Sequence, residues 1–187
     1  MILIRHGQSE FNVVYGATRQ HPGIEDPKLT ELGRDQARAL GPALKALGVA
    51  RLLVSPYTRT LETAALLRES HDVPVTVEPL IRERGAFSCD VGSRRDELAA
   101  RWPDHAFDHL DDVWWSEHEE SDASLHARGH SFRDRMASEG GWHALAVITH
   151  WGFIKALTGL TVGNCVMVRF DPTGAAPPAE LVPATQT

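Results

Sequence analysis

The sequence predicts an α/β fold, a three-layer sandwich in which helices cover both faces of a mostly parallel central sheet. Short apolar runs typical of buried strands alternate along the chain with longer segments whose apolar residues recur at helical spacing. Polar residues capable of chemistry follow directly after three of the strand-like runs. The chain has 187 residues, 42% apolar and 24% charged, which is the size and composition of one compact domain.

The chain opens with an apolar run, Met1 to Ile4, that suits a buried strand and stops directly at Arg5 and His6. A cation and an imidazole therefore stand where a strand passes into a loop. In open α/β proteins, this is where ligands bind and chemistry takes place.

Residues 13–28 are rich in Gly, Pro, Asp and His and lack regular apolar spacing, so we expect a loop beside the site entrance. A helix is expected over residues 30–47, because apolar residues recur there every three to five positions behind Thr30, an acceptable N-cap. The pair Gly41-Pro42 should kink or divide this helix.

Residues 51–54 form a second predicted strand, and a helix follows at once over residues 57–69. A third short strand is expected at residues 74–77. Residues 86–121 are irregular and rich in aromatic and acidic residues, which indicates an excursion from the core with one helix near residues 94–101.

The remaining regular elements are predicted as helices at 124–138 and 153–160 and strands at 144–149 and 165–170. Residues 1–171 would then form a single domain, and residues 172–187, with several prolines among small residues, a flexible tail.

The formal net charge is −6, from 19 Lys and Arg against 25 Asp and Glu, which argues against a broad nucleic-acid-binding face. A small phosphate needs only a local positive pocket, which Arg5, Arg59 and Arg82 could provide.

Chemically similar groups follow three predicted strands: Arg5 and His6 after the first, Arg59 after the second and His150 after the strongest. Because parallel strands end at one edge of a sheet, these groups are expected to converge. Arginine forks match phosphate oxygens, so the convergence predicts an anion site for a phosphomonoester.

A neutral histidine is nucleophilic near pH 7 if its second ring nitrogen donates to a partner such as a backbone carbonyl. His6 fits this role, and Gly7 leaves room for the backbone to approach. Expelling an alkoxide also needs a proton, which Glu83 could supply. Asp90 lies close enough in sequence to compete as the acid.

The opening stretch Arg5-His6-Gly7-Gln8-Ser9-Glu10-Phe11-Asn12 resembles the signature of the histidine phosphatase superfamily, which includes the cofactor-dependent phosphoglycerate mutases. The resemblance continues in order through Leu29-Thr30-Glu31-Leu32-Gly33, Ser55-Pro56-Tyr57-Thr58-Arg59-Thr60-Leu61-Glu62-Thr63-Ala64, Arg82-Glu83 and Thr149-His150-Trp151-Gly152. It covers nearly the whole chain.

The resemblance implies a role for each matching residue. It makes His6 the phosphoryl acceptor, Arg5, Arg59 and His150 the phosphate-binding groups, and Glu83 the proton donor, with Ser9 and Asn12 near the phosphate. Trp151 departs from the small residue common in the family, and we expect it to shape the pocket wall. The stretch after Glu83 also departs, which leaves the choice between Glu83 and Asp90 open.

The sequence thus predicts a phosphomonoester hydrolase that acts on a small phosphorylated metabolite through a phosphohistidine on His6, with no metal or cofactor. The alternatives are phosphoryl transfer of the phosphoglycerate mutase type and a non-catalytic module that binds phosphorylated ligands or proteins. The segment between Glu83 and His150, shorter than the resemblance implies for a mutase, favours hydrolysis. We expect a cytoplasmic protein without nucleic-acid or membrane partners, and the oligomeric state is open.

Overall fold

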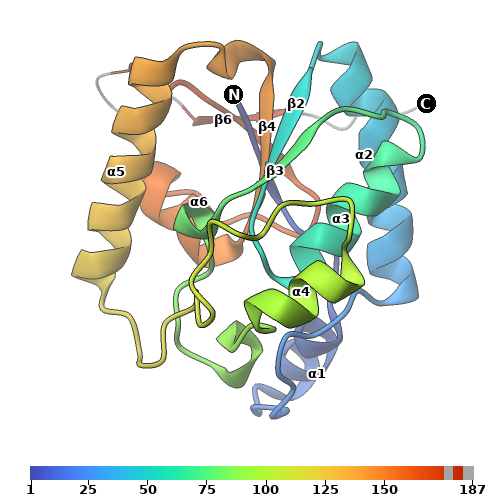
Figure 1. The fold of residues 1–187 in the computed structure, drawn as a ribbon, viewed down its shortest axis with the longest axis vertical. Coiled ribbons are helices and arrows are strands. Elements are labelled where there is room, and N and C mark those ends of the chain that lie inside the picture. The colour runs from blue at the N-terminus through green and yellow to red at the C-terminus, as the bar shows by residue number, and fades with distance from the viewer. Residues whose placement is uncertain (175–178, 183–187) are drawn as a thin grey trace.

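The computed structural model describes residues 1–174 and 179–182, which form a six-stranded sheet with helices on both faces (Figure 1). The strand order is β3-β2-β4-β1-β5-β6. The strands are β1 (Ile2–Arg5), β2 (Arg51–Val54), β3 (Val75–Val77), β4 (Leu145–Thr149), β5 (Met167–Phe170) and β6 (Ala179–Val182). The four strands from β3 to β1 are mutually parallel, whereas β5 and β6 add antiparallel neighbours at one edge. The predicted α/β sandwich with a mostly parallel sheet is therefore confirmed.

Six α-helices accompany the sheet in the described residues. They are α1 (Glu10–Thr18), α2 (Glu31–Ala46), α3 (Thr58–Arg68), α4 (Arg95–Arg101), α5 (Asp122–Glu139) and α6 (Trp151–Thr158). Helices α2 and α3 cover one face of the sheet, and α5 and α6 cover the other (Figure 1). None of the helices in residues 1–174 and 179–182 has the length and apolar character needed to cross a bilayer.

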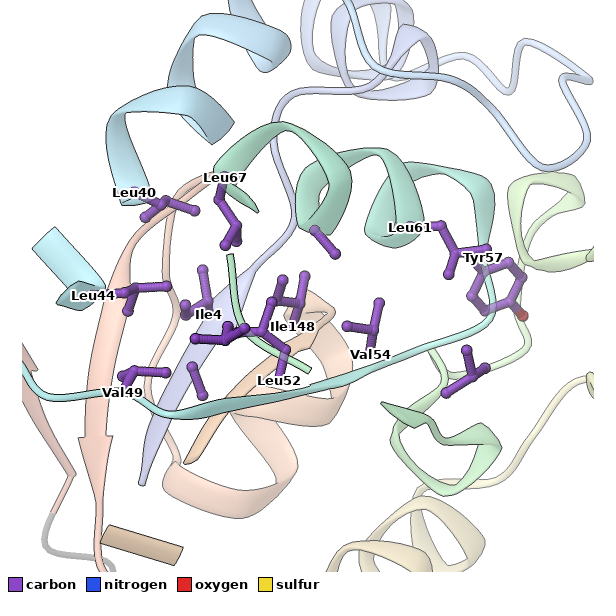
Figure 2. Packing of buried hydrophobic residues seen from close by; sticks show 14 of the residues in the cluster. Ile4, Leu40, Leu44, Val49, Leu52, Val54, Tyr57, Leu61, Leu67 and Ile148 are labelled. Carbon is purple, nitrogen blue, oxygen red and sulfur yellow. The ribbon is translucent and has the colours of Figure 1, made fainter. Parts of the chain in front are cut away.

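The two faces of the sheet are built by the alternation of side chains along each strand. In β1, Ile2 and Ile4 face the cluster under α2 and α3, whereas Leu3 joins the cluster under α5 and α6. Figure 2 shows Ile4 and Ile148 packed among leucines from α2 and α3. Continuous apolar runs are therefore required here, because both faces of each central strand are buried.

The register of the central strands sets where the chemistry lies. Arg5 pairs with Thr149 across β1 and β4, and Val54 pairs with Ile148 across β2 and β4. The residues that follow these strands, including His6 and His150, therefore lie at one edge of the sheet.

Residues 13–28 are only partly a loop, because α1 occupies Glu10–Thr18. A capping box starts this helix: the Ser9 hydroxyl accepts from the Asn12 backbone N–H, and the Asn12 side chain accepts from the Ser9 N–H. The missed helix follows from this local hydrogen bonding rather than from apolar periodicity.

Helix α2 runs without interruption from Glu31 to Ala46, so Gly41-Pro42 does not divide it, which was one of the two outcomes expected for this pair. Gly41 serves a packing purpose instead, because a Cβ there would lie 2.1 Å from Ser70 Oγ and 2.5 Å from the Leu67 carbonyl oxygen at the end of α3. The glycine allows the two helices to approach closely.

Part of the expected flexible tail forms a strand. Residues 179–182 form β6, which pairs antiparallel with β5 and places Val182 opposite Met167. The rest of that prediction concerns residues 175–178 and 183–187, which lie outside the described residues, and residues 172–174, which lead out of β5.

Two glycines hold the loop after β1 against the first turn of α2. A Cβ on Gly33 would lie 2.0 Å from the Gln8 carbonyl oxygen, and a Cβ on Gly7 would lie 2.5 Å from the Gly33 carbonyl oxygen. Thr30 strengthens the contact, since its backbone N–H donates to the Gln8 carbonyl over 2.9 Å. The loop that carries His6 is thus held against α2 by a backbone contact too close for any side chain at Gly7 or Gly33.

We predict that Gly33→Ala destabilises the protein by about 3 kcal/mol, because the new methyl group must displace backbone rather than a flexible side chain. Gly16→Ala is the matched control: a Cβ there meets no atom within 4 Å, and the helical site should gain about 0.5 kcal/mol. Urea denaturation measures both. Equal midpoints for Gly33→Ala and the parent would contradict the account of this contact.

Candidate active site

A cavity of about 610 Å³ opens where β1, β2 and β4 end. Its polar lining includes Arg5, His6, Arg59, Glu83 and Asp90. The predicted convergence of groups after separate strands therefore produces a real concave site, of the size that holds a small molecule.

His6 is held in a defined tautomer. Its Nδ1 lies 2.7 Å from the Gly7 carbonyl oxygen, and because a carbonyl only accepts, Nδ1 carries the proton. The Nε2 lone pair is therefore the free one. The Gly7 backbone N–H donates to Thr63 Oγ1 over 3.1 Å, which orients the peptide that holds the ring.

Burial, followed by the positive charges of Arg59 and Arg5, holds the pKa of His6 well below its usual range. The ring is 3% exposed. His6 is consequently neutral at pH 7, which is the state a nucleophilic imidazole needs.

The His150 ring packs against the His6 ring, with the ring centroids 5.2 Å apart and the planes tilted by 58°. It is fully buried and does not line the cavity, and its Nε2 lies 2.8 Å from Ser55 Oγ. Its Nδ1 has no hydrogen-bond partner among the described residues. Burial first, then the charge of Arg59, lowers the pKa of His150 well below its usual range, so this ring is neutral too.

The two arginines are fixed by backbone carbonyls. Arg5 Nη1 donates to the Val162 carbonyl over 2.9 Å, and Arg59 Nη1 donates to the Cys89 carbonyl over 2.7 Å. The Arg59 guanidinium also lies 4.3 Å from the centroid of the Tyr57 ring. Both cations therefore reach the cavity from fixed positions, with little further ordering needed to meet an anion.

The Glu83 side chain packs against the first turn of α6, where the Gly152 backbone N–H donates to its carboxyl group over 2.9 Å. A Cβ on Gly152 would lie 2.4 Å from Glu83 Oε1, so this position must be glycine for the carboxyl to approach. Burial, followed by the negative charge of Asp90, raises the pKa of Glu83, and the hydrogen bonds from Arg84 and Gly152 only partly oppose this. A carboxyl with a raised pKa is suited to proton transfer.

Asp90 has a different environment, although it also lines the cavity. Its Oδ2 accepts the backbone N–H groups of Ala86 and Phe87 over 3.2 and 3.0 Å, and its Oδ1 lies 3.3 Å from Arg59 Nη2. These donors are those that stabilise a carboxylate. Asp90 is therefore the buried counter-ion of Arg59.

A buried arginine on α5 holds the segment that carries Glu83. Arg128 Nη1 donates to the carbonyls of Leu80 and Arg82 over 2.8 Å each. Its Nη2 donates to Glu120 Oε2 over 2.6 Å, and Glu120 is 5% exposed. Burial would raise the pKa of Glu120, but the hydrogen bonds and charge of Arg128 outweigh it and lower this pKa. The ion pair thus stays charged, and Arg128 holds Glu120 and the segment of Leu80 and Arg82 against α5.

The other predicted site residues also lie at the cavity. Ser9, Asn12 and Trp151 all line it. Ser9 and Asn12 form the cap of α1, and Asn12 Oδ1 additionally accepts from Asn164 Nδ2 over 3.1 Å. Trp151 starts α6, is 37% exposed and lies 4.8 Å below Lys155 Nζ.

Arg82 does not line the cavity, so its suggested part in the phosphate pocket is not supported. Its Nη2 lies 3.9 Å from Glu120 Oε1, away from the site, while the next arginine, Arg84, is the one in the lining. Counting positive charges in the sequence cannot tell which of these two arginines reaches the cavity.

Several contributors were missed from the sequence. Thr63 and Ser55 lie inside the matched motifs, where their spacing could have marked them as partners of the Gly7 backbone and of His150. Asn164, whose Nδ2 donates to the His6 carbonyl over 3.0 Å, carries no local signal. Within residues 1–174 and 179–182, no group of three or more His, Cys, Asp or Glu side chains is arranged to hold a metal ion.

A family model described as the histidine phosphatase superfamily (branch 1) matches residues 1–168. A 2,3-bisphosphoglycerate-dependent phosphoglycerate mutase of Methylobacterium sp. (strain 4-46) is 38% identical over 107 residues, which are 54% of this chain and 49% of the relative. A glucosyl-3-phosphoglycerate phosphatase of Mycolicibacterium vanbaalenii is 28% identical over 171 residues, 87% of this chain and 74% of the relative.

The solved structure of a mycobacterial glucosyl-3-phosphoglycerate phosphatase in complex with VO3 has the same fold. Its TM-score is 0.65 at 22% identity, with 97% of this chain and 96% of that chain covered. The match to the first curated relatives is shorter, since this chain spans about half of their length.

We predict that His6 and His150 stay neutral well below pH 6.5, because burial and the nearby arginines lower both pKa values. Their ring-proton NMR signals, assigned with His6→Asn and His150→Asn variants, should keep neutral-form shifts from pH 8 down to about pH 5.5. A signal from either ring that titrates with a midpoint near 6.5 would contradict the described environment.

Proposed function

The chain belongs to the histidine phosphatase superfamily, and we propose that it hydrolyses small phosphomonoesters through a phosphohistidine on His6. The observation that carries the proposal is the hydrogen bond from His6 Nδ1 to the Gly7 carbonyl. It leaves Nε2 unprotonated in a cavity that also holds Arg5 and Arg59.

In the first step, His6 Nε2 attacks the phosphorus and the bond to the leaving oxygen breaks. Glu83 gives its proton to that oxygen, so an alcohol rather than an alkoxide departs. Arg5 and Arg59 stabilise the charge on the equatorial oxygens. His150 does not line the cavity and packs against the His6 ring, with the ring centroids 5.2 Å apart.

In the second step, the Glu83 carboxylate takes a proton from water, and the water oxygen attacks the phosphohistidine. The nitrogen–phosphorus bond breaks, inorganic phosphate leaves, and His6 returns to its neutral form. Glu83 is protonated again, so the cycle closes without a metal or cofactor.

Hydrolysis is favoured over mutase chemistry by two observations. The phosphatase relative aligns with 87% of this chain, whereas the mutase relative aligns with 54%. The exposed rings of Phe87 and Trp151 at the cavity leave it accessible to water, which a mutase must exclude from its phosphoenzyme. A cytoplasmic location stays a prediction.

Mutase activity is the second candidate, because curated relatives at 36 to 38% identity bear that name. Phosphate release and the interconversion of 2- and 3-phosphoglycerate are measured on the same preparation. Interconversion well above phosphate release would replace the proposed hydrolysis.

We expect His6→Ala to abolish phosphate release from 4-nitrophenyl phosphate, a fall of at least about 10⁴-fold, because no other group can form the covalent intermediate. Turnover by this variant at the parent rate would contradict the proposal. A binding module without catalysis would show no release in the parent either.

Glu83→Gln should slow hydrolysis of an alkyl phosphate by about 10²- to 10⁴-fold, because an alkoxide must leave without a proton. The burst of 4-nitrophenol from 4-nitrophenyl phosphate should fall far less, since that leaving group departs as an anion. Asp90→Asn is the discriminating variant. If it, rather than Glu83→Gln, gives the loss selective for alkyl phosphates, the acid is Asp90.

A further inference from the structure

The cavity has a second half, made of aromatic rings, that phosphate chemistry does not explain. Phe11 and Tyr15 lie four residues apart on α1, and their rings stack with centroids 5.3 Å apart and an interplanar angle of 15°. Phe87, from the segment after Glu83, completes the group at 5.8 Å from Phe11 and 5.5 Å from Tyr15. All three side chains line the cavity.

Phe87 leaves an apolar surface uncovered in this cluster. Its side chain is 41% exposed although it packs against two rings on α1 and against His21, whose centroid is 5.2 Å away. A large aromatic side chain left this exposed inside a concave site loses the free energy that its burial would give. A flat apolar group bound there would recover it.

The aromatic half is held at a fixed place relative to the phosphate half. Asp90 accepts the Phe87 backbone N–H with one oxygen and meets Arg59 with the other. The buried Asp90 carboxylate therefore connects the backbone of Phe87 to the Arg59 guanidinium, which we expect to bind the phosphoryl group. The two halves form one prearranged site rather than two independent surfaces.

The lining around the rings is mixed in character. Gly16, Pro27 and Ala86 contribute no polar side-chain atom, whereas Arg19, whose guanidinium lies 5.7 Å from the Tyr15 ring centroid, also lines the cavity. A flat ring bound here gains contact with the faces of the aromatic side chains.

We infer that the substrate is a phosphomonoester whose leaving group carries an aromatic ring, bound against the cluster of Phe11, Tyr15 and Phe87 while the phosphoryl group faces His6. This inference rests on the proposed function, since it places the phosphorus at His6. It goes further by naming the chemical class that the rest of the cavity accepts, with the ring stacked on or edge-on to the aromatic side chains.

A matched pair of substrates tests the inference. The substrates 2-phenylethyl phosphate and ethyl phosphate both release a primary alcohol of similar acidity, so they differ in the ring and hardly in chemical reactivity. We expect kcat/KM for 2-phenylethyl phosphate to exceed that for ethyl phosphate by at least about tenfold. A ratio near one, with clear turnover of both, would overturn the substrate class and leave the hydrolase intact.

Phe87→Ala locates the effect. The ratio of the two kcat/KM values should fall about tenfold in this variant, because the phenyl ring of the substrate loses its contact with the exposed ring of Phe87. Leu32→Ala is the control, since Leu32 is 54% exposed and outside the cavity lining, and it should leave the ratio as in the parent. An unchanged ratio in Phe87→Ala would overturn the assignment of the ring to this cluster.

Binding of non-hydrolysable analogues separates the two proposals. Calorimetry with 3-phenylpropylphosphonate and propylphosphonate measures the preference for the ring without turnover. Tighter binding of the phenyl compound together with no phosphate release from any ester would overturn the hydrolase and support the aromatic site. Equal binding of both phosphonates would overturn the aromatic site.

Discussion

The hydrogen bond between His6 Nδ1 and the Gly7 carbonyl is the interaction on which the site depends. It sets the tautomer and directs the other nitrogen into the cavity. The bond itself requires the loop after β1 to keep its shape, and that shape comes from the contact between Gly7 and Gly33. Gly33 on α2 is a motif residue far from the reacting atoms. Its role is to keep the His6 imidazole in position.

The charge of the site is more balanced than its arginines suggest. His6 and His150 are both neutral, and Asp90 lies against Arg59, so the cations face a carboxylate even before an anion binds. An incoming phosphomonoester therefore meets guanidinium groups that backbone carbonyls and one carboxylate already hold in place. Burial and then the charge of the same Asp90 raise the pKa of Glu83, so the counter-ion of Arg59 also favours the protonated form of Glu83.

The sequence predicted the strand ends and most helices because burial on both faces and helical spacing leave strong local patterns. It also offered a backbone carbonyl as an example of a partner for the second nitrogen of His6, and the Gly7 carbonyl takes that place. Helix α1 was missed because hydrogen bonds of Ser9 and Asn12 start it, and β6 was missed because edge pairing with β5 leaves little apolar pattern. The part played by Asp90 could not be predicted, since its contact with Arg59 joins residues 31 positions apart.

The most direct test of the account identifies which nitrogen of which histidine carries the phosphoryl group. The parent protein is mixed rapidly with 4-nitrophenyl phosphate, quenched in alkali, and analysed by mass spectrometry and phosphorus NMR. The account predicts phosphate bonded to Nε2 of His6, because Nδ1 donates to the Gly7 carbonyl. Phosphate on Nδ1 of His6, or on His150, would contradict it.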